Sequence, residues 1–254
     1  MQYTKPLVSV IMPAYNAEPF IAEAIGSVQA QTVSDWELIV LDDGSSDQTL
    51  AILSDFAEKD PRIRLFVNEE NMGVARTRNR GLDLVQGKFI AFLDSDDYWK
   101  PHMLQTMLAR AEETKADIIY CSYELVDEQG QKVCNDFIVP PATTFEESIV
   151  RSVITCSTVL TTAALLKNNR FPTNMYHEDI AMWFLILRDG AMARGVPEVL
   201  AAYRQRADSR SAGKLTSACR RWPIYRKHLG LPFLQCVKTM IRYGYYGMKK
   251  FKRV

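Results

Sequence analysis

The chain has 254 residues, of which 47% are hydrophobic and 24% are charged. This composition supplies enough apolar surface for one sizeable core and excludes a largely disordered chain. The formal net charge is +1, but residues 203–254 contain 14 of the 31 Lys and Arg residues and only one of the 30 acidic residues. The tail is therefore strongly basic and the remainder acidic, which suits a tail that meets phosphate, anionic lipid or an acidic protein surface.

Neither the cysteines nor the hydropathy pattern indicates export or membrane insertion. The five cysteines form no CxxC pair and no metal-binding pattern with the three histidines, so we expect reduced thiols and a cytoplasmic location. The sequence does not start with a basic segment followed by an apolar run, and no later window holds about 18 uncharged apolar residues. We expect neither a cleaved signal nor a membrane-spanning segment.

Short apolar runs alternate with amphipathic segments over the first hundred residues, which is typical of β-α-β units in a parallel sheet. Pro13 is expected to end the first strand. The expected strands cover residues 7–12, 36–41, 63–67 and 89–93. The expected helices lie between them, at residues 20–28, from the N-cap Asp47 to Phe56, and at 73–85.

Beyond Pro101 the alternation is looser and predicts a mixed sheet packed onto the first. The expected elements are helices at 101–113, 146–154 and 178–187, strands at 117–125 and 198–203, and a helical pair at 213–248 broken at Gly230-Leu231-Pro232. We therefore predict one α/β domain with a helical tail. Its boundaries are residues 1–208 for the domain, with halves at 1–100 and 101–208, and 209–254 for the basic amphipathic tail.

Two acidic turns each follow an apolar strand: DDGS at Asp42–Ser45, and DSDD at Asp94–Asp97, here called the DSDD loop. In a parallel sheet both turns lie at the carboxyl edge, where ligands of open α/β sheets bind. Carboxylates gathered there repel one another unless a cation or a ligand satisfies them. Mg²⁺ and Mn²⁺ are commonly held by one or two carboxylates plus substrate phosphates. A polar turn with a helix cap would explain one such turn, but two together predict a metal that needs a diphosphate.

The order of these motifs resembles the family-2 glycosyltransferases, which have the GT-A fold. The resemblance covers the first hundred residues closely and residues 155–204 more loosely. It runs through VSVIMPAYN, WELIVLDDGSSDQT, NMGVARTRNRG, KFIAFLDSDDYWKP and MYHEDIAMWF. It implies a Rossmann-like nucleotide-binding parallel sheet merged with a smaller mixed acceptor-side sheet and followed by a helical C-terminal tail.

The resemblance also implies which residues surround the nucleotide. They are Pro13, Tyr15, Asn16, Asp43, Arg78, Asp94 and Ser95. Asp43 would hydrogen-bond the base, which is uracil in the commonest members, and Asp94 would meet the ribose or the waters on the metal. Asp96 would ligate the divalent cation, Mn²⁺ or Mg²⁺, that bridges the two phosphates. Packing roles for Pro13 and Tyr15, and an ion pair for Arg78, remain as alternatives.

The HEDIAMW stretch resembles the family's ED motif, whose Asp is the general base in inverting members. That position is Asp179, with Glu178 as an alternative base. A base must lie near the acceptor hydroxyl, opposite the leaving diphosphate. Either carboxylate could instead be favoured only by the helix N-terminus. Trp183, one turn further on, would stack on an acceptor sugar or pack in the core.

The segment after the last expected strand resembles the part of relatives that closes over the diphosphate. Its candidate phosphate donors are Arg204, Arg210 and Ser211. The QxxRW motif of processive synthases is absent, because Arg221-Trp222 lacks a Gln three residues before the Arg. This difference favours the addition of a single sugar.

The tail carries apolar and basic residues at helical spacing. The apolar positions are Phe233, Val237, Met240, Ile241, Tyr245 and Met248, and the basic ones are Lys238, Arg242 and Lys249. A basic amphipathic helix predicts an anchor on an anionic membrane surface, here the inner face of the plasma membrane. Docking onto the acidic body of the chain, or a homodimer contact, are the alternatives.

Together, these patterns predict an inverting, metal-dependent glycosyltransferase. It would move a sugar from a nucleotide-diphosphate sugar, with UDP expected, to a polysaccharide or lipid-linked oligosaccharide, as in bacterial envelope synthesis of the teichuronic-acid type. A nucleotidyltransferase acting on sugar phosphates is disfavoured, since residues 13–17 lack the glycines of a phosphate loop. A catalytically silent membrane-docking scaffold is the other alternative. No nucleic-acid partner is expected.

Overall fold

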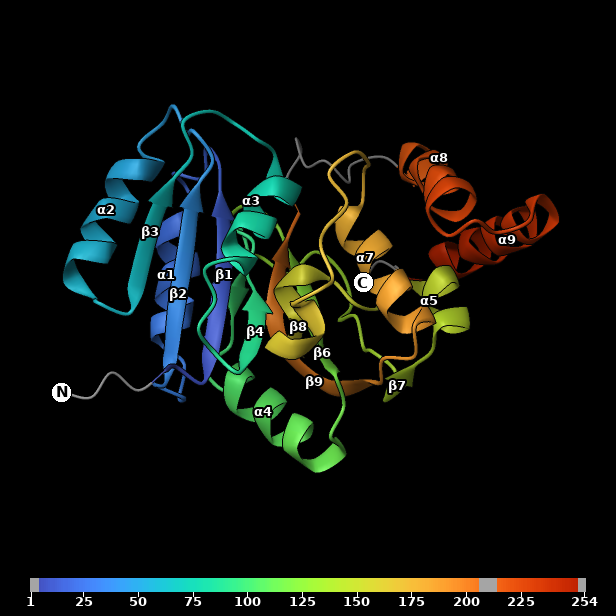
Figure 1. Ribbon diagram of the computed structural model, residues 1–254, viewed down its shortest axis with the longest axis horizontal. Coiled ribbons are helices and arrows are strands. Elements are labelled where there is room, and N and C mark those ends of the chain that lie inside the picture. The colour runs from blue at the N-terminus through green and yellow to red at the C-terminus, as the bar shows by residue number, and fades with distance from the viewer. Residues whose placement is uncertain (1–4, 206–213, 251–254) are drawn as a thin grey trace.

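A computed structural model describes the backbone of residues 5–205 and 214–250 and the side chains within 5–205 and 219–246. Its centre is a mixed sheet with helices on both faces (Figure 1). The strand order is β3-β2-β1-β4-β8-β6-β9-β5, with β7 paired to β9. The predicted α/β class is confirmed. The second half does not pack onto the first sheet as expected, because β8 joins β4 and continues the same sheet.

The first half forms the parallel part of the sheet. Its strands are β1 (Val8–Ala14), β2 (Trp36–Asp42), β3 (Ile63–Val67) and β4 (Phe89–Phe92). Its helices are α1 (Ile21–Gln29), α2 (Thr49–Lys59) and α3 (Val74–Leu82). Every residue of β1 and β2 is buried, because Val10 packs toward α1 and its neighbour Ile11 packs toward α3. Burial on both faces explains their unbroken apolar runs.

The second half adds antiparallel pairs to this sheet. Its elements are β5 (Tyr98–Trp99), α4 (Met103–Thr114), β6 (Ile118–Val126), β7 (Ala142–Thr143), α5 (Phe145–Arg151), the 3-10 turn η1 (Cys156–Thr158), β8 (Val159–Thr162), α6 (Ala163–Leu166), α7 (Glu178–Arg188) and β9 (Ala193–Arg204). The strand β8 pairs antiparallel with both β4 and β6. It is therefore the seam between the two halves.

Pro13 does not end the first strand as expected but lies inside β1. The carbonyl of Ile11 faces β4, because it accepts the amide of Leu93. Residues two apart on a strand face the same way, so Pro13 also faces β4, beyond the last pair of the two strands at Ile11 and Phe92. Its missing N–H therefore costs no ladder hydrogen bond.

The tail forms α8 (Lys214–Pro223), the π-helical turn η2 (Ile224–His228) and α9 (Phe233–Lys250), so the predicted break between two helices is confirmed. Gly230 makes that turn in the left-handed region, with φ at 67°. The two helices pack on α5 and α7 through an apolar cluster that contains Phe184, Tyr225 and Cys236. The expected domain boundary at residue 208 lies outside the described residues. Within the described part, no helix is both long and apolar enough to cross a bilayer.

Candidate functional site

The turn after β2 is fastened to the end of β1. Asn16 adopts a left-handed conformation with φ at 47°, and its side-chain oxygen accepts the amide of Ser46 at 2.8 Å. In return, the backbone amide of Asn16 donates to the hydroxyl of Ser45. Gly44 has φ at 75°, so a side chain would be strained there. The predicted nucleotide residues Pro13, Tyr15 and Asn16 therefore share one rigid edge with DDGS, and the Tyr15 ring is 49% exposed.

Asp43, predicted to read the base, is buried and holds a neighbouring loop. One carboxylate oxygen accepts from Asn68 at 2.6 Å and from the amide of Met72 at 3.0 Å. The other oxygen accepts the amide of Gly73 at 2.9 Å, where α3 begins. These contacts fix the N-terminus of the helix that carries Arg78. A contact between Asp43 and a base stays a prediction.

The DSDD loop follows β4 at the same edge, as predicted. Asp94, Ser95 and Asp96 are half-buried and Asp97 is buried. The amide of Asp94 donates to the hydroxyl of Ser157 in η1 at 3.2 Å. Burial and the negative charges of Asp96 and Asp94 raise the pKa of Asp97. The half-buried carboxylates therefore face outward while Asp97 supports the loop from inside.

Arg78 joins the DSDD loop to α7. One guanidinium nitrogen lies 2.5 Å from a carboxylate oxygen of Asp94, and another lies 3.0 Å from Glu178. The side chains of Arg78 and Glu178 are only 5% and 6% exposed, so both ion pairs are poorly screened by solvent. The ion-pair alternative for Arg78 is therefore present in the structure, and a contact between Arg78 and a nucleotide stays a prediction. The carboxylate of Glu178 is therefore engaged in an ion pair with Arg78.

Asp179 lies beside this ion pair in the first turn of α7. Burial and the charge of Glu178 raise its pKa to about 6, while Arg78 and the amide of Ile180 lower it. Asp94 also raises this pKa, which places Asp179 within electrostatic reach of the DSDD loop. A carboxylate with a pKa near neutrality is suited to accept a proton at physiological pH.

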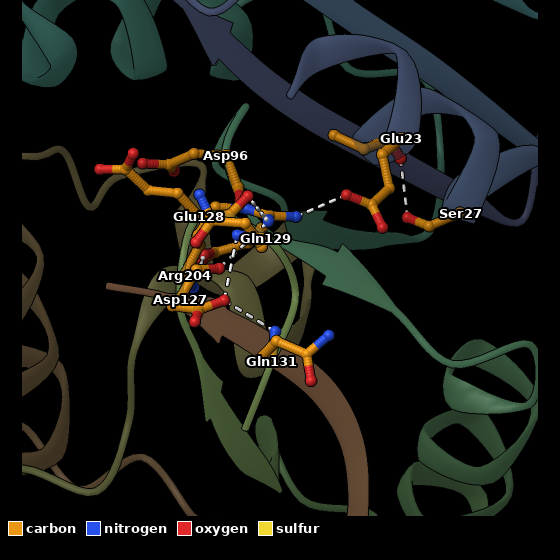
Figure 2. A network of polar contacts seen from close by, with 10 residues as sticks. Glu23, Ser27, Asp96, Asp127, Glu128, Gln129, Gln131 and Arg204 are labelled. Carbon is orange, nitrogen blue, oxygen red and sulfur yellow. Dashed lines mark hydrogen bonds and ion pairs between the residues drawn. The ribbon is translucent and has the colours of Figure 1, made fainter. Parts of the chain in front are cut away.

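Arg204, predicted to donate to phosphate, instead lies at the centre of a polar network (Figure 2). Its guanidinium donates to the carbonyl of Asp96 at 2.8 Å, to the carbonyls of Asp127 and Glu128 at 3.2 and 2.9 Å, and to the carboxylate of Glu23 on α1. Its own backbone amide donates to Asp97 at 2.8 Å. The side chain is 3% exposed. Arg204 therefore holds the backbone of the DSDD loop.

Three further residues were predicted to contact the acceptor or the phosphates: Trp183, Arg210 and Ser211. Trp183 is 1% exposed and packs edge-on to Phe92, with ring centroids 6.4 Å apart. Its position in the core leaves no face for an acceptor sugar, so the packing alternative holds. Arg210 and Ser211 lie outside the described residues.

The half-buried carboxylates fit a divalent cation that takes further ligands from a substrate. Arg78 donates to one oxygen of Asp94, and among the described residues no further hydrogen bond to this carboxylate is seen. No group of three or more His, Cys, Asp or Glu side chains among the described residues could hold a metal alone. One or two carboxylates completed by phosphate oxygens is the usual arrangement for Mg²⁺.

Sequence comparison places this chain among known enzymes. Residues 9–133 match the model of glycosyl transferase family 2. A putative teichuronic acid biosynthesis glycosyltransferase, TuaG of Bacillus subtilis, is 34% identical over 97% of this chain and 98% of its own length.

The chain belongs to glycosyltransferase family 2. This chain is also similar to WfgD of Escherichia coli, named as a UDP-Glc:alpha-D-GlcNAc-diphosphoundecaprenol beta-1,3-glucosyltransferase, which is 34% identical over 96% of this chain and 94% of its own length. Membership in family 2 makes the chain a glycosyltransferase and removes the nucleotidyltransferase alternative.

Solved structures share the fold of this chain. The crystal structure of Staphylococcus aureus TarS residues 1–349 with UDP-GlcNAc matches with a TM-score of 0.72 at 23% identity, over 95% of this chain and 72% of that one. A mannosyltransferase of Pyrobaculum calidifontis with GDP-Man and Mn²⁺ matches with a TM-score of 0.71 at 18% identity, over 96% of this chain and 70% of that one. The GT-A fold is confirmed.

Sequence patterns missed the residues that support the DSDD loop from elsewhere in the chain. Ser157 stands in η1, just before β8, a strand that the patterns did not predict. Besides accepting from Asp94, it offers its carbonyl to the indole of Trp99 at 2.8 Å. Glu23 sits on the outer face of α1, where an acidic residue usually indicates only solvent exposure. No local signal distinguishes either residue from its neighbours.

Proposed function

We propose that this chain transfers a sugar from a UDP-sugar, with inversion and with the help of a divalent cation, to a saccharide acceptor. The observation that carries the proposal is the Arg78 bridge between Asp94 and Glu178. It brings the DSDD loop and Asp179, which are more than eighty residues apart in sequence, to one place. A diphosphate site and a candidate base at the same edge are the two parts that such a transfer needs.

In the proposed reaction each described residue has a limited task. Asp179 accepts the proton of the acceptor hydroxyl as that oxygen attacks the anomeric carbon. Arg78 pairs with Glu178 and opposes the rise in the pKa of Asp179. Asp96, with Asp94, would hold the cation, which when bound neutralises charge on the departing diphosphate. The half-exposed ring of Tyr15 stands at the edge where the nucleotide would lie.

UDP is the nucleotide we propose on the basis of relatives. WfgD is named for a UDP-Glc donor, and TarS was solved with UDP-GlcNAc. The acceptor named for WfgD is a diphosphoundecaprenol-linked sugar. We propose a lipid-linked saccharide of envelope polysaccharide synthesis for this chain too, used at the cytoplasmic face of the plasma membrane.

Thermal unfolding with nucleotides tests the donor site. UDP with Mn²⁺ should raise the Tm by roughly 5 °C at saturating concentrations, because ligand that binds only the folded state stabilises it. UDP without metal should have a much smaller effect, and GDP should have little. Asp96→Asn should lose the metal-dependent shift. Asp55→Asn, which removes a half-exposed carboxylate on α2, should keep it.

The outcomes separate the parts of the proposal. No shift with any nucleotide would overturn the donor assignment. An equal shift with and without Mn²⁺ would overturn the role of the cation, and a normal shift in Asp96→Asn would remove that residue as its ligand.

A further inference from the structure

The helix α9 has an exposed apolar stripe in addition to the face that packs on the body. Cys236 and Thr239 are 0% and 5% exposed, and Cys236 belongs to the apolar cluster with α5 and α7. Leu234, Ile241 and Tyr245 are 80%, 68% and 50% exposed. These three positions are seven and four residues apart, so they lie on one side of the helix. The tail is therefore docked and still leaves an apolar face uncovered.

The charged residues beside this stripe are basic in the part of α9 whose side chains the structure describes. Lys238 and Arg242 are exposed on the same helix, four residues apart and beside the apolar positions. No Asp or Glu occurs in the sequence after Asp208. Phe233, 60% exposed, extends the apolar surface at the start of α9. The exposed face of α9 thus combines apolar side chains with cations, and the helix itself contributes no anion.

The combination of apolar and basic side chains indicates what kind of partner binds the exposed face of α9. Grouped exposed apolar side chains indicate an interaction surface. In a two-fold dimer through this face, the same patch would meet itself, which would gather Lys238 and Arg242 of both copies in one interface with like charge. A bilayer of anionic lipid has the matching chemistry, because acyl chains accept the apolar residues and headgroups attract the cations. Charge complementarity therefore favours lipid over a second copy.

We propose that the exposed face of α9 binds the surface of an anionic bilayer. Leu234, Ile241 and Tyr245 enter the interface, and Lys238 and Arg242 lie at the headgroups. This identifies by residue the membrane contact that the proposed function requires. Met248 and Lys249, expected on the same helix from its sequence, lie outside the described side chains.

Docking through α9 would also orient the acceptor side of the enzyme. The turn η2, between α8 and α9, stacks Tyr225 on Phe184 of α7 with ring planes 16° apart, and the Tyr225 hydroxyl donates to the carbonyl of Ile149 on α5 at 2.5 Å. The same α7 carries Asp179. Figure 1 shows α8 and α9 at the end of the molecule away from α2 and β3. A lipid-linked acceptor would therefore approach Asp179 from the docked side, an inference that rests on the proposed function.

Co-sedimentation of the full chain with vesicles tests the docking. The wild type should bind vesicles that contain phosphatidylglycerol, bind phosphatidylcholine vesicles weakly, and release as salt increases. The double variant Leu234→Ser, Ile241→Ser should bind the anionic vesicles at least about tenfold more weakly. It lacks the two aliphatic side chains that the bilayer would bury when the protein binds. The matched control Ile138→Ser removes an isoleucine that is 56% exposed on the body, and it should bind like the wild type.

Unchanged vesicle binding by the double variant, or no binding by the wild type, would overturn the proposal. Self-association in solution that the double variant abolishes, without vesicle binding by either protein, would assign the face to a second copy and overturn it too. The UDP-dependent Tm shift should be unaffected in the double variant. A failure of the docking is thereby distinguished from a failure of the donor site.

Discussion

Two buried arginines hold the DSDD loop, and they differ in what they bind. Arg78 binds two carboxylates, those of Asp94 and Glu178. Arg204 binds three backbone carbonyls and a single carboxylate, that of Glu23, whose side chain is 54% exposed. Removing Arg78 would leave unbalanced negative charge, whereas removing Arg204 would leave mainly unsatisfied neutral acceptors. Arg78 therefore sets the electrostatics of the site, and Arg204 sets the backbone path of the loop.

The largest effect is expected at Asp179, the carboxylate whose pKa is lowered by the neighbouring Arg78. Asp179→Asn should keep metal-dependent UDP binding and lower turnover by roughly 10²–10⁴, the usual contribution of a general base. In the wild type, log(kcat/KM) should rise with slope one up to a pH near 6 and then level off, because the base must be deprotonated. Near-normal turnover in Asp179→Asn would exclude this residue as the base.

The same variant tests the pKa through stability. The pKa of Asp179 is about 6 in the folded chain against an ordinary value of 3.8, so folding favours its protonated form. The associated stabilisation is complete below about pH 4 and is lost as the pH rises through about 6. Asp179→Asn lacks this loss and should unfold at a higher temperature than the wild type at pH 8, with the difference vanishing near pH 4. A variant less stable at pH 8 would contradict the raised pKa.

Arg78→Met should have the next largest effect and should act through charge. Glu178 would remain buried without its cation, which typically costs about 3–5 kcal/mol of folding free energy. Because Arg78 lowers the pKa of Asp179, its loss should also move the rising limb of the pH–rate profile to higher pH. Thermal unfolding and a pH–rate profile measure the two effects.

The double variant Arg78→Met, Glu178→Gln provides the control for this prediction. It removes the stranded charge and should recover most of the lost stability. It should also bring the pH profile back toward that of the wild type, since the charge of Glu178 raises the pKa of Asp179. A profile that stays unchanged in both variants would show that Arg78 has only a structural role.

Sequence patterns predicted the strands that bring the two acidic turns to one edge, because burial on both faces leaves continuous apolar runs such as those of β1 and β2. They did not predict β8, a four-residue strand that begins directly after the turn η1. The pairing of Arg78 with Glu178 spans 100 residues, and no periodicity within a helix encodes such a contact. The order of the motifs identified the candidate residues. Tertiary packing determines which of their side chains are buried and which are exposed at the site.

Trp183 and Arg204 show why residue type alone misleads. An indole suits sugar stacking and a guanidinium suits phosphate, so residue type allows a ligand contact for both, with core packing as the alternative for Trp183. The seven buried residues of α7 put Trp183 in the core. Arg204 ends β9 between α1, the DSDD loop and the turn at Asp127, so backbone carbonyls reach its donors.

Arg204→Met should have the smallest effect on the chemistry and a distinct signature. Its partly buried carbonyl partners would lose their donor, which costs at most about 1–3 kcal/mol, while the amide that binds Asp97 is part of the backbone and remains. With the Asp96 carbonyl released, the DSDD loop should bind metal less well, so the Mn²⁺ concentration for half-maximal activity should rise more than kcat falls. The pH–rate profile should not move, unlike that of Arg78→Met.

Glu23→Gln is the control, because it removes only the half-exposed ion pair. It should change the free energy of unfolding by less than about 1 kcal/mol and leave the Mn²⁺ dependence normal. A shifted pH profile in Arg204→Met would mean that both arginines act through charge and would remove the distinction between them.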